Sequence, residues 1–258
     1  MNATTRGGRG AADAGGAGQV GAVIFDWGGT ITPWHTVDIN EQWRVFAREY
    51  HLDEDPSLVD ELAARIWEAE SAGWARGRDD GASARIEEIL AEAGVVADDP
   101  RAVAGLAAYE EFWEPHTWTD PQIRPLWEAL RDNDIRVGVL SNTIWSRDYH
   151  RGLFERDGVL HLVDADVYSS ETPWVKPNPE IFLEAARRVG VDPAQCVYVG
   201  DRGYEDVHGP QSVGMRAILV PHSDIPASQQ VAHDATPDAV VHELLDVLDI
   251  TLRWHGRR

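Results

Sequence analysis

The chain of 258 residues is poor in the side chains that build disulfides, thiolate clusters and membrane spans. It has one cysteine, Cys196, so neither an intrachain disulfide nor a metal site of several thiolates can form. Cys196 begins an apolar run, which predicts a small buried hydrophobic residue. Nothing resembles a signal peptide, and no apolar segment approaches the length that crosses a bilayer. We therefore expect a cytoplasmic protein without a membrane partner.

Basic residues are also scarce. The chain has 23 arginines and lysines against 44 acidic residues, which gives a net charge of −21. A surface this acidic repels phosphate backbones and anionic lipid headgroups, so we expect no nucleic acid or membrane partner. A small molecule is the expected partner, and a monomer or homodimer the expected assembly. Lys176 is the only lysine among the basic residues.

The first 19 residues are rich in glycine and alanine, which predicts a flexible tail. Residues 16–21 match the dinucleotide-binding pattern G-x-G-x-x-G. In such a site the glycines follow a strand and open a helix, whereas these glycines precede the first predicted strand. We therefore assign no dinucleotide site to them.

Apolar periodicity changes once in the first half of the chain. Residues 20–25 are apolar throughout, apart from one glycine, which predicts a strand covered on both faces. From Asp38 to Trp113 apolar residues recur at helical spacing, which predicts a compact helical block rich in tryptophan. The apolar positions of the block are Ile39, Trp43, Phe46, Tyr50, Leu58, Leu62, Ile66, Trp67, Ile86, Ile89, Leu90, Val103, Leu106, Tyr109, Phe112 and Trp113. The tryptophans expected mainly in its core are Trp34, Trp43, Trp67, Trp74, Trp113 and Trp118.

After Pro121 predicted helices and strands alternate. The strands are residues 136–140, 163–168, 197–199 and 217–220, and the helices are residues 126–131, 145–154, 179–189, 205–213 and 241–252. This alternation predicts an α/β fold, a doubly wound parallel sheet with helices on both faces. The expected organisation is a tail (1–19), a Rossmann-type core (20–34 and 119–258) and an inserted helical domain (35–118).

Polar residues occur where the predicted strands end. They are Asp26 after the first strand, Ser141 and Asn142 after the second, Lys176 before the helix at 179–189, and Asp201, Glu205 and Asp206 after the fourth. Because chemistry in doubly wound sheets lies at the carboxyl ends of the strands, we expect these residues at one rim. Aspartates are hard oxygen ligands that suit Mg²⁺, and a lysine can neutralise phosphate and lower the pKa of a nearby aspartate. A carboxylate that attacks phosphorus is a known form of covalent catalysis.

This arrangement resembles the haloacid dehalogenase superfamily of phosphotransferases and hydrolases over residues 20–222. The superfamily's four motifs occur in order as Asp26-Trp27-Gly28-Gly29-Thr30, Val139-Leu140-Ser141-Asn142, Lys176-Pro177, and Gly200-Asp201 with Glu205-Asp206. Each motif alone is weakly specific, but four of them in order at strand ends are strong support. The helical insert is similar to the family's helical cap, which closes over the substrate.

The resemblance implies a role for each of these residues. Asp26 is the expected nucleophile, and Ser141 and Lys176 are expected to bind the phosphoryl group. The expected Mg²⁺ ligands are Asp26, the backbone carbonyl of Gly28, Asp201, Glu205 and Asp206. The expected substrate-binding residues are Thr30, which also stabilises the turn after Asp26, Asn142, and two tryptophans near the substrate, Trp34 and Trp174.

Gly28 departs from the pattern of the family's phosphatases, which have a second aspartate two residues after the nucleophile. That acid protonates the leaving oxygen and later activates water, a contribution of about 10²–10⁴-fold in rate. Glycine keeps the backbone carbonyl but has no side chain to give this help. A phosphatase or phosphotransferase must then rely on a good leaving group, an assisting water or another residue, such as His35.

Three other functions stay open at this point. Phosphonate hydrolases of the superfamily have a similar first motif, but they need a cap lysine for a Schiff base, and the helical block has no lysine. Dehalogenases also lack the second aspartate but need no metal, whereas the crowded acids Asp201, Glu205 and Asp206 favour a cation. The last is a binding protein without turnover, which the presence of Asp26 and Lys176 disfavours.

The residues together predict a capped, Mg²⁺-dependent phosphohydrolase. We expect it to act on a small phosphorylated metabolite, a phosphomonoester or acyl phosphate, through an aspartyl-phosphate at Asp26. Turnover of this intermediate should be slow, because position 28 supplies no acid or base.

Overall fold

Parallel strands form the centre of the molecule. The computed structural model describes residues 19–33, 37–52, 54–80, 83–221 and 231–256. The strands are β1 (Ala22–Phe25), β2 (Arg136–Ser141), β3 (Ala165–Tyr168), β4 (Cys196–Gly200), β5 (Arg216–Leu219) and β6 (Ala239–Val240). They form one sheet in the order β3-β2-β1-β4-β5-β6, and each neighbouring pair is parallel. The predicted parallel sheet is confirmed.

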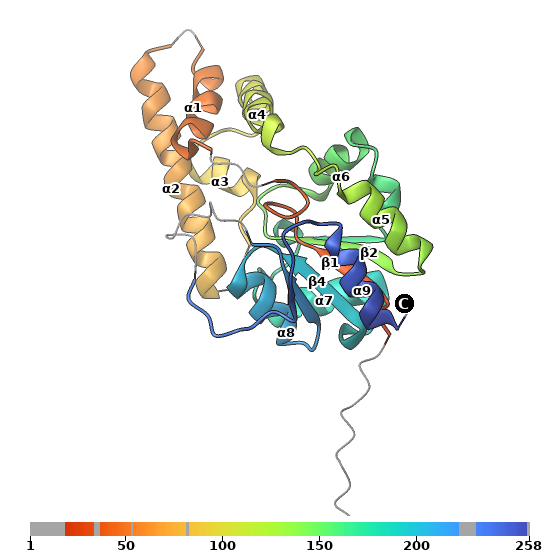
Figure 1. Cartoon of the computed structure of the whole chain (residues 1–258). Helices are drawn as coiled ribbons and strands as arrows, with labels where there is room; N and C mark the ends of the chain where they lie inside the picture. Colours follow the sequence, from red (N-terminus) through yellow and green to blue (C-terminus); the bar gives the residue numbers. More distant parts are fainter. Residues whose placement is uncertain (1–18, 34–36, 53, 81–82, 222–230, 257–258) are drawn as a thin grey trace, which may run out of the picture.

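Helices cover both faces of this sheet (Figure 1). One face carries α5 (Ile123–Asp132), α6 (Arg147–Arg156) and α9 (Asp246–His255), and the other carries α7 (Pro179–Val189) with the short α8 (Gly209–Gln211). Short 3-10 turns are η2 (Leu160–Leu162), η3 (Ser169–Glu171) and η4 (Pro193–Gln195), and η5 (Tyr204–His208) is a π-helical turn. Alternate strand residues point to opposite faces, so both faces of the central strands are buried and their sequences are apolar throughout.

The inserted cap lies between β1 and α5. It contains α1 (Ile39–Tyr50), α2 (Pro56–Asp80), α3 (Ile86–Glu92), α4 (Pro100–Trp113) and the 3-10 turn η1 (Glu114–His116). These helices stand beside the α/β core in Figure 1 and bury a hydrophobic cluster of their own. Inside it the indole of Trp43 donates a hydrogen bond of 2.7 Å to Glu70. The cap is therefore a separately packed helical layer, although the predicted boundaries at 34/35 and 118/119 stay predictions.

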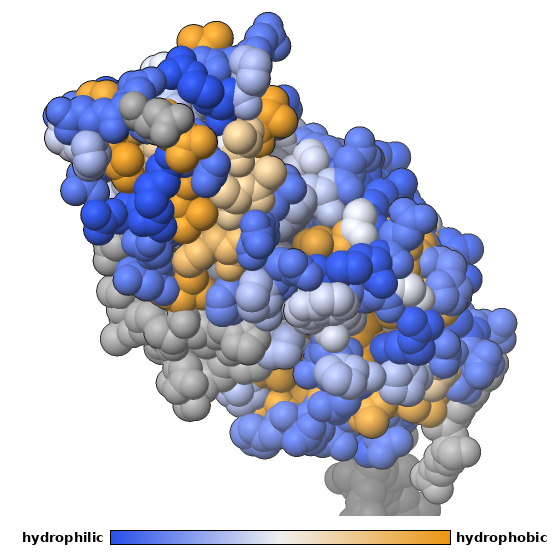
Figure 2. Space-filling view, turned by 90° about the horizontal axis from the view of Figure 1, so that it is seen from above, coloured by the Kyte–Doolittle hydropathy of each residue, from blue (hydrophilic) through white to orange (hydrophobic). Residues whose placement is uncertain are grey.

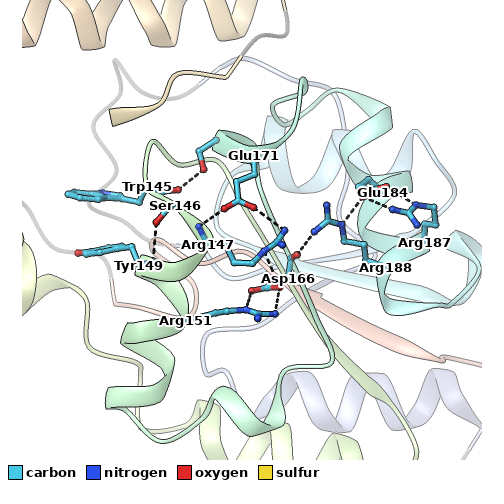
Figure 3. A network of polar contacts seen from close by, with 11 residues as sticks. Trp145, Ser146, Arg147, Tyr149, Arg151, Asp166, Glu171, Glu184, Arg187 and Arg188 are labelled. Atoms are coloured by element: carbon cyan, nitrogen blue, oxygen red, sulfur yellow. Dashed lines mark hydrogen bonds and ion pairs between the residues drawn. The ribbon is translucent and has the colours of Figure 1, made fainter. Parts of the chain in front are cut away.

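The cap contacts the core through the loop that follows β2. Ile144 packs into the cap cluster, and its carbonyl accepts a hydrogen bond of 3.1 Å from the backbone N–H of Ile86. Trp145 continues the contact, with its ring 5.1 Å from Tyr109 of the cap and stacked at 4.3 Å on Tyr149. The rings of Trp145 and Tyr149 project side by side in Figure 3, away from the ion pairs of the core.

On its other side, α6 is held to the edge strand β3 by ion pairs (Figure 3). Asp166 of β3 is buried and accepts two hydrogen bonds from Arg151, of 2.8 and 3.0 Å. Arg147 lies 3.5 Å from Asp166 and 3.2 Å from Glu171. α6 therefore connects the sheet to the cap, with charges on one side and aromatic rings on the other.

Some predicted element boundaries differ from the structure. The last helix begins at Asp246, not at residue 241, because residues 242–245 form bends and a turn before it. The strand β6, at residues 239–240, was not predicted from the sequence. The predicted helix 205–213 is a π-helical turn followed by the short α8. α6 begins at Arg147 because Ser146 caps it, its Oγ accepting a hydrogen bond of 3.2 Å from the backbone of Tyr149.

Three residues expected in the cap core lie instead at the surface. Val103, Trp67 and Trp118 are 63%, 41% and 48% exposed. Val103 belongs to α4, which packs on α1 by its opposite side, and Trp118 lies under the guanidinium of Arg156, 3.8 Å from the ring centroid. Helical spacing identifies an apolar stripe but not how wide a stripe the neighbouring helices cover. Trp43 is fully buried, as predicted, and Trp34 lies outside the described residues.

The surface agrees with the acidic composition. Most side chains in Figure 2 are hydrophilic; the apolar ones form a band on the left of that view and smaller separate patches at its centre and lower right. Cys196 is buried in β4, as predicted, and burial raises the pKa of its thiol to about 12. Within the described residues, every helix is too short or too polar to cross a membrane.

Candidate active site

The carboxyl ends of β1, β2 and β4 lie at one edge of the sheet. Asp26 follows β1, Ser141 ends β2 and Asp201 follows β4, and each of the three is at most 5% exposed. The backbone N–H of Asp26 donates to the carbonyl of Val199 at 2.8 Å, which fixes the end of β1 against β4. The residues that the sequence places at strand ends are therefore neighbours in space.

Asp26, Asp201 and Asp206 form a cluster of buried carboxylates. One oxygen from each lies within 4.8 Å of the others. Asp206 reaches the cluster from the π-helical turn after β4, and its Oδ2 accepts a hydrogen bond of 2.9 Å from the backbone of Arg202. Gly200 leaves the room for this approach, since a Cβ there would lie 2.4 Å from Cγ of Asp206.

The ammonium group of Lys176 lies among these carboxylates and is buried. Its Nζ donates at 2.7 Å to Asp26, at 2.7 Å to Asp206 and at 3.0 Å to the hydroxyl of Tyr198. The Tyr198 hydroxyl donates in turn to the carbonyl of Leu140 at 3.0 Å. An ammonium has three protons, so each proton of Lys176 has an acceptor in the protein.

Burial dominates the electrostatics of the cluster. It raises the pKa of Asp26 to about 6, with repulsion from Asp206 and against the lowering effect of Lys176. Burial, together with Asp26 and Asp206, also raises the pKa of Asp201 well above its usual range. Burial lowers the pKa of Lys176, but the two carboxylates outweigh it and raise the pKa. Lys176 thus acts on Asp26 in the predicted direction, but the net shift of the Asp26 pKa is upward.

The donor set fits a divalent cation. Both carboxylate oxygens of Asp201 are buried and have no hydrogen-bond partner among the described residues. An unpaired buried carboxylate is strongly unfavourable, and one lysine offsets only part of the charge of three. Carboxylate oxygens that converge on one point are the ligands of Mg²⁺ in proteins. Asp26, Asp201 and Asp206 would hold such an ion.

Asn142 and Thr30 take different positions around the cluster. The side chain of Asn142 exchanges two hydrogen bonds with the backbone of Lys176, of 2.8 and 3.1 Å, and so holds the lysine segment to the end of β2. The hydroxyl of Thr30 is buried, with no partner among the described residues. The substrate contacts expected for both residues stay predictions.

The other residues predicted for the site lie around the carboxylate cluster and not within it. Glu205 is half-buried beside Asp206, and the carboxylate cluster found among the described residues does not include it. Trp174 packs partly buried against the hydrophobic cluster under α7. Gly28 forms a bridge with Thr32 in the turn after the nucleophile, and the metal role of its carbonyl stays a prediction.

Sequence reasoning missed two residues next to the site. The first is Tyr198. It lies in an apolar strand, where the sequence does not distinguish it from a core residue. His150 is the other; it lies under Trp27 with ring centroids 4.6 Å apart and stacks on Tyr168 at 4.4 Å. Its Nε2 lies 3.1 Å from Oγ1 of Thr143, and burial lowers its pKa to about 3. A neutral histidine therefore supports the residue that follows the nucleophile.

Comparison with known proteins agrees with this geometry. A family model described as haloacid dehalogenase-like hydrolase matches residues 20–214. A glyceraldehyde 3-phosphate phosphatase of Methanopyrus kandleri is 28% identical over 162 residues, 63% of this chain and 69% of that protein. The haloacid dehalogenase-like hydrolase domain-containing protein 3 of Homo sapiens is 31% identical over 193 residues, 70% of this chain and 74% of that protein.

A solved structure extends the similarity to the cap. A 2-haloacid dehalogenase of Pseudomonas syringae superposes with a TM-score of 0.64 at 25% identity, over 92% of this chain and 100% of that chain. The match covers the α/β core and the helices inserted after β1 alike. With its sheet order, its inserted helices and its motif residues gathered at one edge, the chain belongs to the haloacid dehalogenase-like hydrolases.

Proposed function

We propose that this hydrolase releases phosphate from a small phosphorylated metabolite, with Mg²⁺, through an aspartyl-phosphate at Asp26. The observation that carries the proposal is the buried cluster of Asp26, Asp201 and Asp206 around Lys176, with ligand oxygens within 4.8 Å of one another. A divalent cation would neutralise the charge that three carboxylates and one lysine leave in excess, and such a cation favours the binding of an anionic phosphoryl group over a neutral organic substrate.

The roles of the residues follow from their positions. Asp26 attacks phosphorus with a carboxylate oxygen, and Lys176 fixes the orientation of that carboxylate through its hydrogen bond of 2.7 Å. Ser141, at the end of β2, donates its hydroxyl to a phosphoryl oxygen. Bound Mg²⁺ would draw charge from the phosphoryl oxygens. The cap excludes bulk water from the reacting groups.

The proposed partner is a small metabolite, and no nucleic acid or membrane is proposed. The net charge of −21 supports this, because it disfavours binding to polyanions. A single buried cysteine is compatible with the cytoplasm, which we keep as the proposed compartment. A monomer or homodimer remains the proposed assembly.

Dehalogenation is the second candidate, because the Pseudomonas syringae relative carries that name and Gly28 leaves position 28 without an acid. A carboxylate that displaces halide from carbon needs no cation, so dehalogenation by Asp26 would not explain why Asp201 and Asp206 are buried beside it. Chloride release from a 2-chloro acid therefore serves as the competing readout in the test below.

The test measures phosphate release from a panel of phosphorylated metabolites, with glyceraldehyde 3-phosphate and acetyl phosphate among them. It uses the full chain, with and without Mg²⁺, as wild type, Asp26→Asn and Asp166→Asn. Asp166 is a second buried aspartate of the sheet, 4% exposed, and controls for the loss of a buried carboxylate. We expect Mg²⁺-dependent release that falls to background in Asp26→Asn and persists in Asp166→Asn. Release that survives in Asp26→Asn, or chloride release in place of phosphate release, would contradict the proposal.

A further inference from the structure

The protons of Lys176 and Tyr198, next to Asp26, all form hydrogen bonds with acceptors of the protein. The three protons of Lys176 point to Asp26, Asp206 and Tyr198, and the proton of Tyr198 points to the carbonyl of Leu140. To protonate a leaving group, either residue would have to leave a buried acceptor unpaired, which costs about 1–3 kcal/mol. Among the described residues of the cluster, neither Lys176 nor Tyr198 is therefore placed as a general acid.

The other polar groups of the site do not replace them. The hydroxyls of Ser141 and Thr30 are alcohols, and an alcohol gives up its proton no more readily than the alcohol that an alkyl phosphate releases. Asp201 is deprotonated whenever it holds a divalent cation, because metal ligands bind in their ionised form. None of these side chains can assist the departure of a strongly basic oxygen, and His35, the other residue considered for this role, lies outside the described residues.

Position 28 has the space for an acid but not the side chain. A Cβ built on Gly28 meets no atom within 4 Å, and Gly28 is absent from the glycines of positive φ. A Cβ at position 28 would therefore fit the turn without strain. The absence of an acid next to the nucleophile is thus a property of this residue, not a consequence of crowding.

We propose that this enzyme is selective for phosphoryl compounds whose leaving group is weakly basic and departs without a proton, with acyl phosphates as the main class. The inference rests on the proposed function, since it concerns the same attack by Asp26. Aryl phosphates, enol phosphates and phosphoanhydrides share this property, whereas alkyl phosphates do not. The general acid that Gly28 does not supply is worth about 10²–10⁴-fold for a basic leaving group and little for a carboxylate.

Both steps balance without a proton donor. In the first, an oxygen of Asp26 bonds to phosphorus while the bond from phosphorus to the leaving oxygen breaks, and that oxygen keeps the electron pair. In the second, a water oxygen bonds to phosphorus, the bond to Asp26 breaks to restore the carboxylate, and the proton of the water passes to solvent. The second step has no base from position 28 and is the slower one.

The experiment measures kcat/KM for a series of aryl phosphates of increasing leaving-group basicity, together with acetyl phosphate and glycerol 3-phosphate. It uses the full chain with Mg²⁺ as wild type, Gly28→Asp and Gly28→Ala. We expect wild-type kcat/KM to fall by about 10²–10⁴-fold from acetyl phosphate to glycerol 3-phosphate. Gly28→Asp should recover much of the rate on glycerol 3-phosphate, while Gly28→Ala keeps the wild-type dependence, whatever its absolute rate.

The outcomes separate this inference from the proposed function. Equal rates of the wild type on acetyl phosphate and glycerol 3-phosphate would overturn the inference and leave phosphate release by Asp26 intact. A folded, active Gly28→Asp with the wild-type dependence on leaving-group basicity would also overturn it. If Gly28→Asp does not fold, the wild-type series alone decides. Failure of the wild type to release phosphate from any member, acetyl phosphate included, would overturn both proposals.

Discussion

His150 is a fully buried histidine that the fold keeps neutral beneath Trp27. Burial lowers its pKa to about 3, while in the unfolded chain a histidine titrates near 6.5. Between these values the unfolded chain binds a proton that the native state does not bind. The free energy of unfolding therefore falls as the pH falls below about 6.5, by about 1.4 kcal/mol per pH unit from this residue.

We predict that His150 accounts for a loss of about 2 kcal/mol between pH 7.5 and pH 5.0. His150→Phe keeps an aromatic ring in the stack and removes the titrating group, so this part of the pH dependence should disappear. Urea unfolding at both pH values measures it, with His161→Phe, an exposed position, as the control that should retain the wild-type dependence. An unchanged pH dependence in His150→Phe would show that the histidine is not held neutral.

Residues of the site differ in whether the sequence alone could identify them. Asp26, Ser141 and Asp201 could be predicted, because the end of a parallel strand fixes the position of the next residue. Tyr198 and His150 could not, because an apolar strand and an amphipathic helix explain their presence without any function. Only the folded chain shows that the Tyr198 hydroxyl accepts a hydrogen bond from Lys176.

Packing between α1 and α4 depends on one small residue. A Cβ on Gly105 of α4 would lie 2.8 Å from the ring of Phe46 and 3.0 Å from its carbonyl oxygen. The two helices approach each other closely at this point, and a larger residue would push them apart. Gly152 of α6 is different, since a Cβ there meets no atom within 4 Å.

The two glycines predict opposite effects of the same substitution. Gly105→Ala should lower the free energy of unfolding by about 1–3 kcal/mol through overpacking. Gly152→Ala should raise it by about 0.5–1 kcal/mol, because alanine loses less backbone entropy in a helix than glycine. Urea unfolding of the two variants beside the wild type measures both. If Gly105→Ala were as stable as Gly152→Ala, the close contact of α1 with α4 would be wrong.

Among the helices, a regular one with clear end signals was predicted with its correct bounds, whereas an irregular turn was not. The helix at 179–189 has Asn178 as its N-cap and Gly190 at its end, and its predicted bounds match α7. The π-helical turn after β4 was predicted as ordinary helix, since its sequence has the same periodicity. Asp206 lies in this turn and belongs to the carboxylate cluster, so the turn is part of the site.

The molecule as a whole carries an excess of negative charge, and three of its carboxylates are buried together at the candidate site. With a net charge of −21, long-range repulsion adds to the local repulsion among Asp26, Asp201 and Asp206. A cation that binds only the native state stabilises it by about 2.7 kcal/mol at a hundred times its dissociation constant.

We predict that Mg²⁺ raises the Tm of the wild type at pH 7.5 and raises it less at pH 5. Ligand oxygens must be deprotonated, and the pKa of Asp26, which burial raises to about 6, favours its protonated form at pH 5. The pKa of Asp201 is raised as well, which acts in the same direction. Asp201→Asn should lose most of the shift at pH 7.5, while Glu205→Gln should retain it. Equal shifts for the wild type and Asp201→Asn would place the cation elsewhere.

The organisation of the whole chain could be predicted from the change of hydrophobic period. A helical block between the first and second strands became the cap, and the alternating part became the sheet and its helices. The contact between them could not be predicted. It depends on Ile144 and Trp145, which follow the predicted phosphoryl-binding residue in the sequence but pack with the cap.

The most direct test of the account is whether Asp26 becomes phosphorylated during the reaction. The full chain is mixed with acetyl phosphate and Mg²⁺, quenched in acid, and its peptides are examined by mass spectrometry. We predict a phosphoryl group on Asp26, which accumulates because position 28 provides no base for its hydrolysis, and no such group on the peptide of Asp26→Asn. Phosphate release by the wild type without any phosphoryl group on Asp26 would contradict the account.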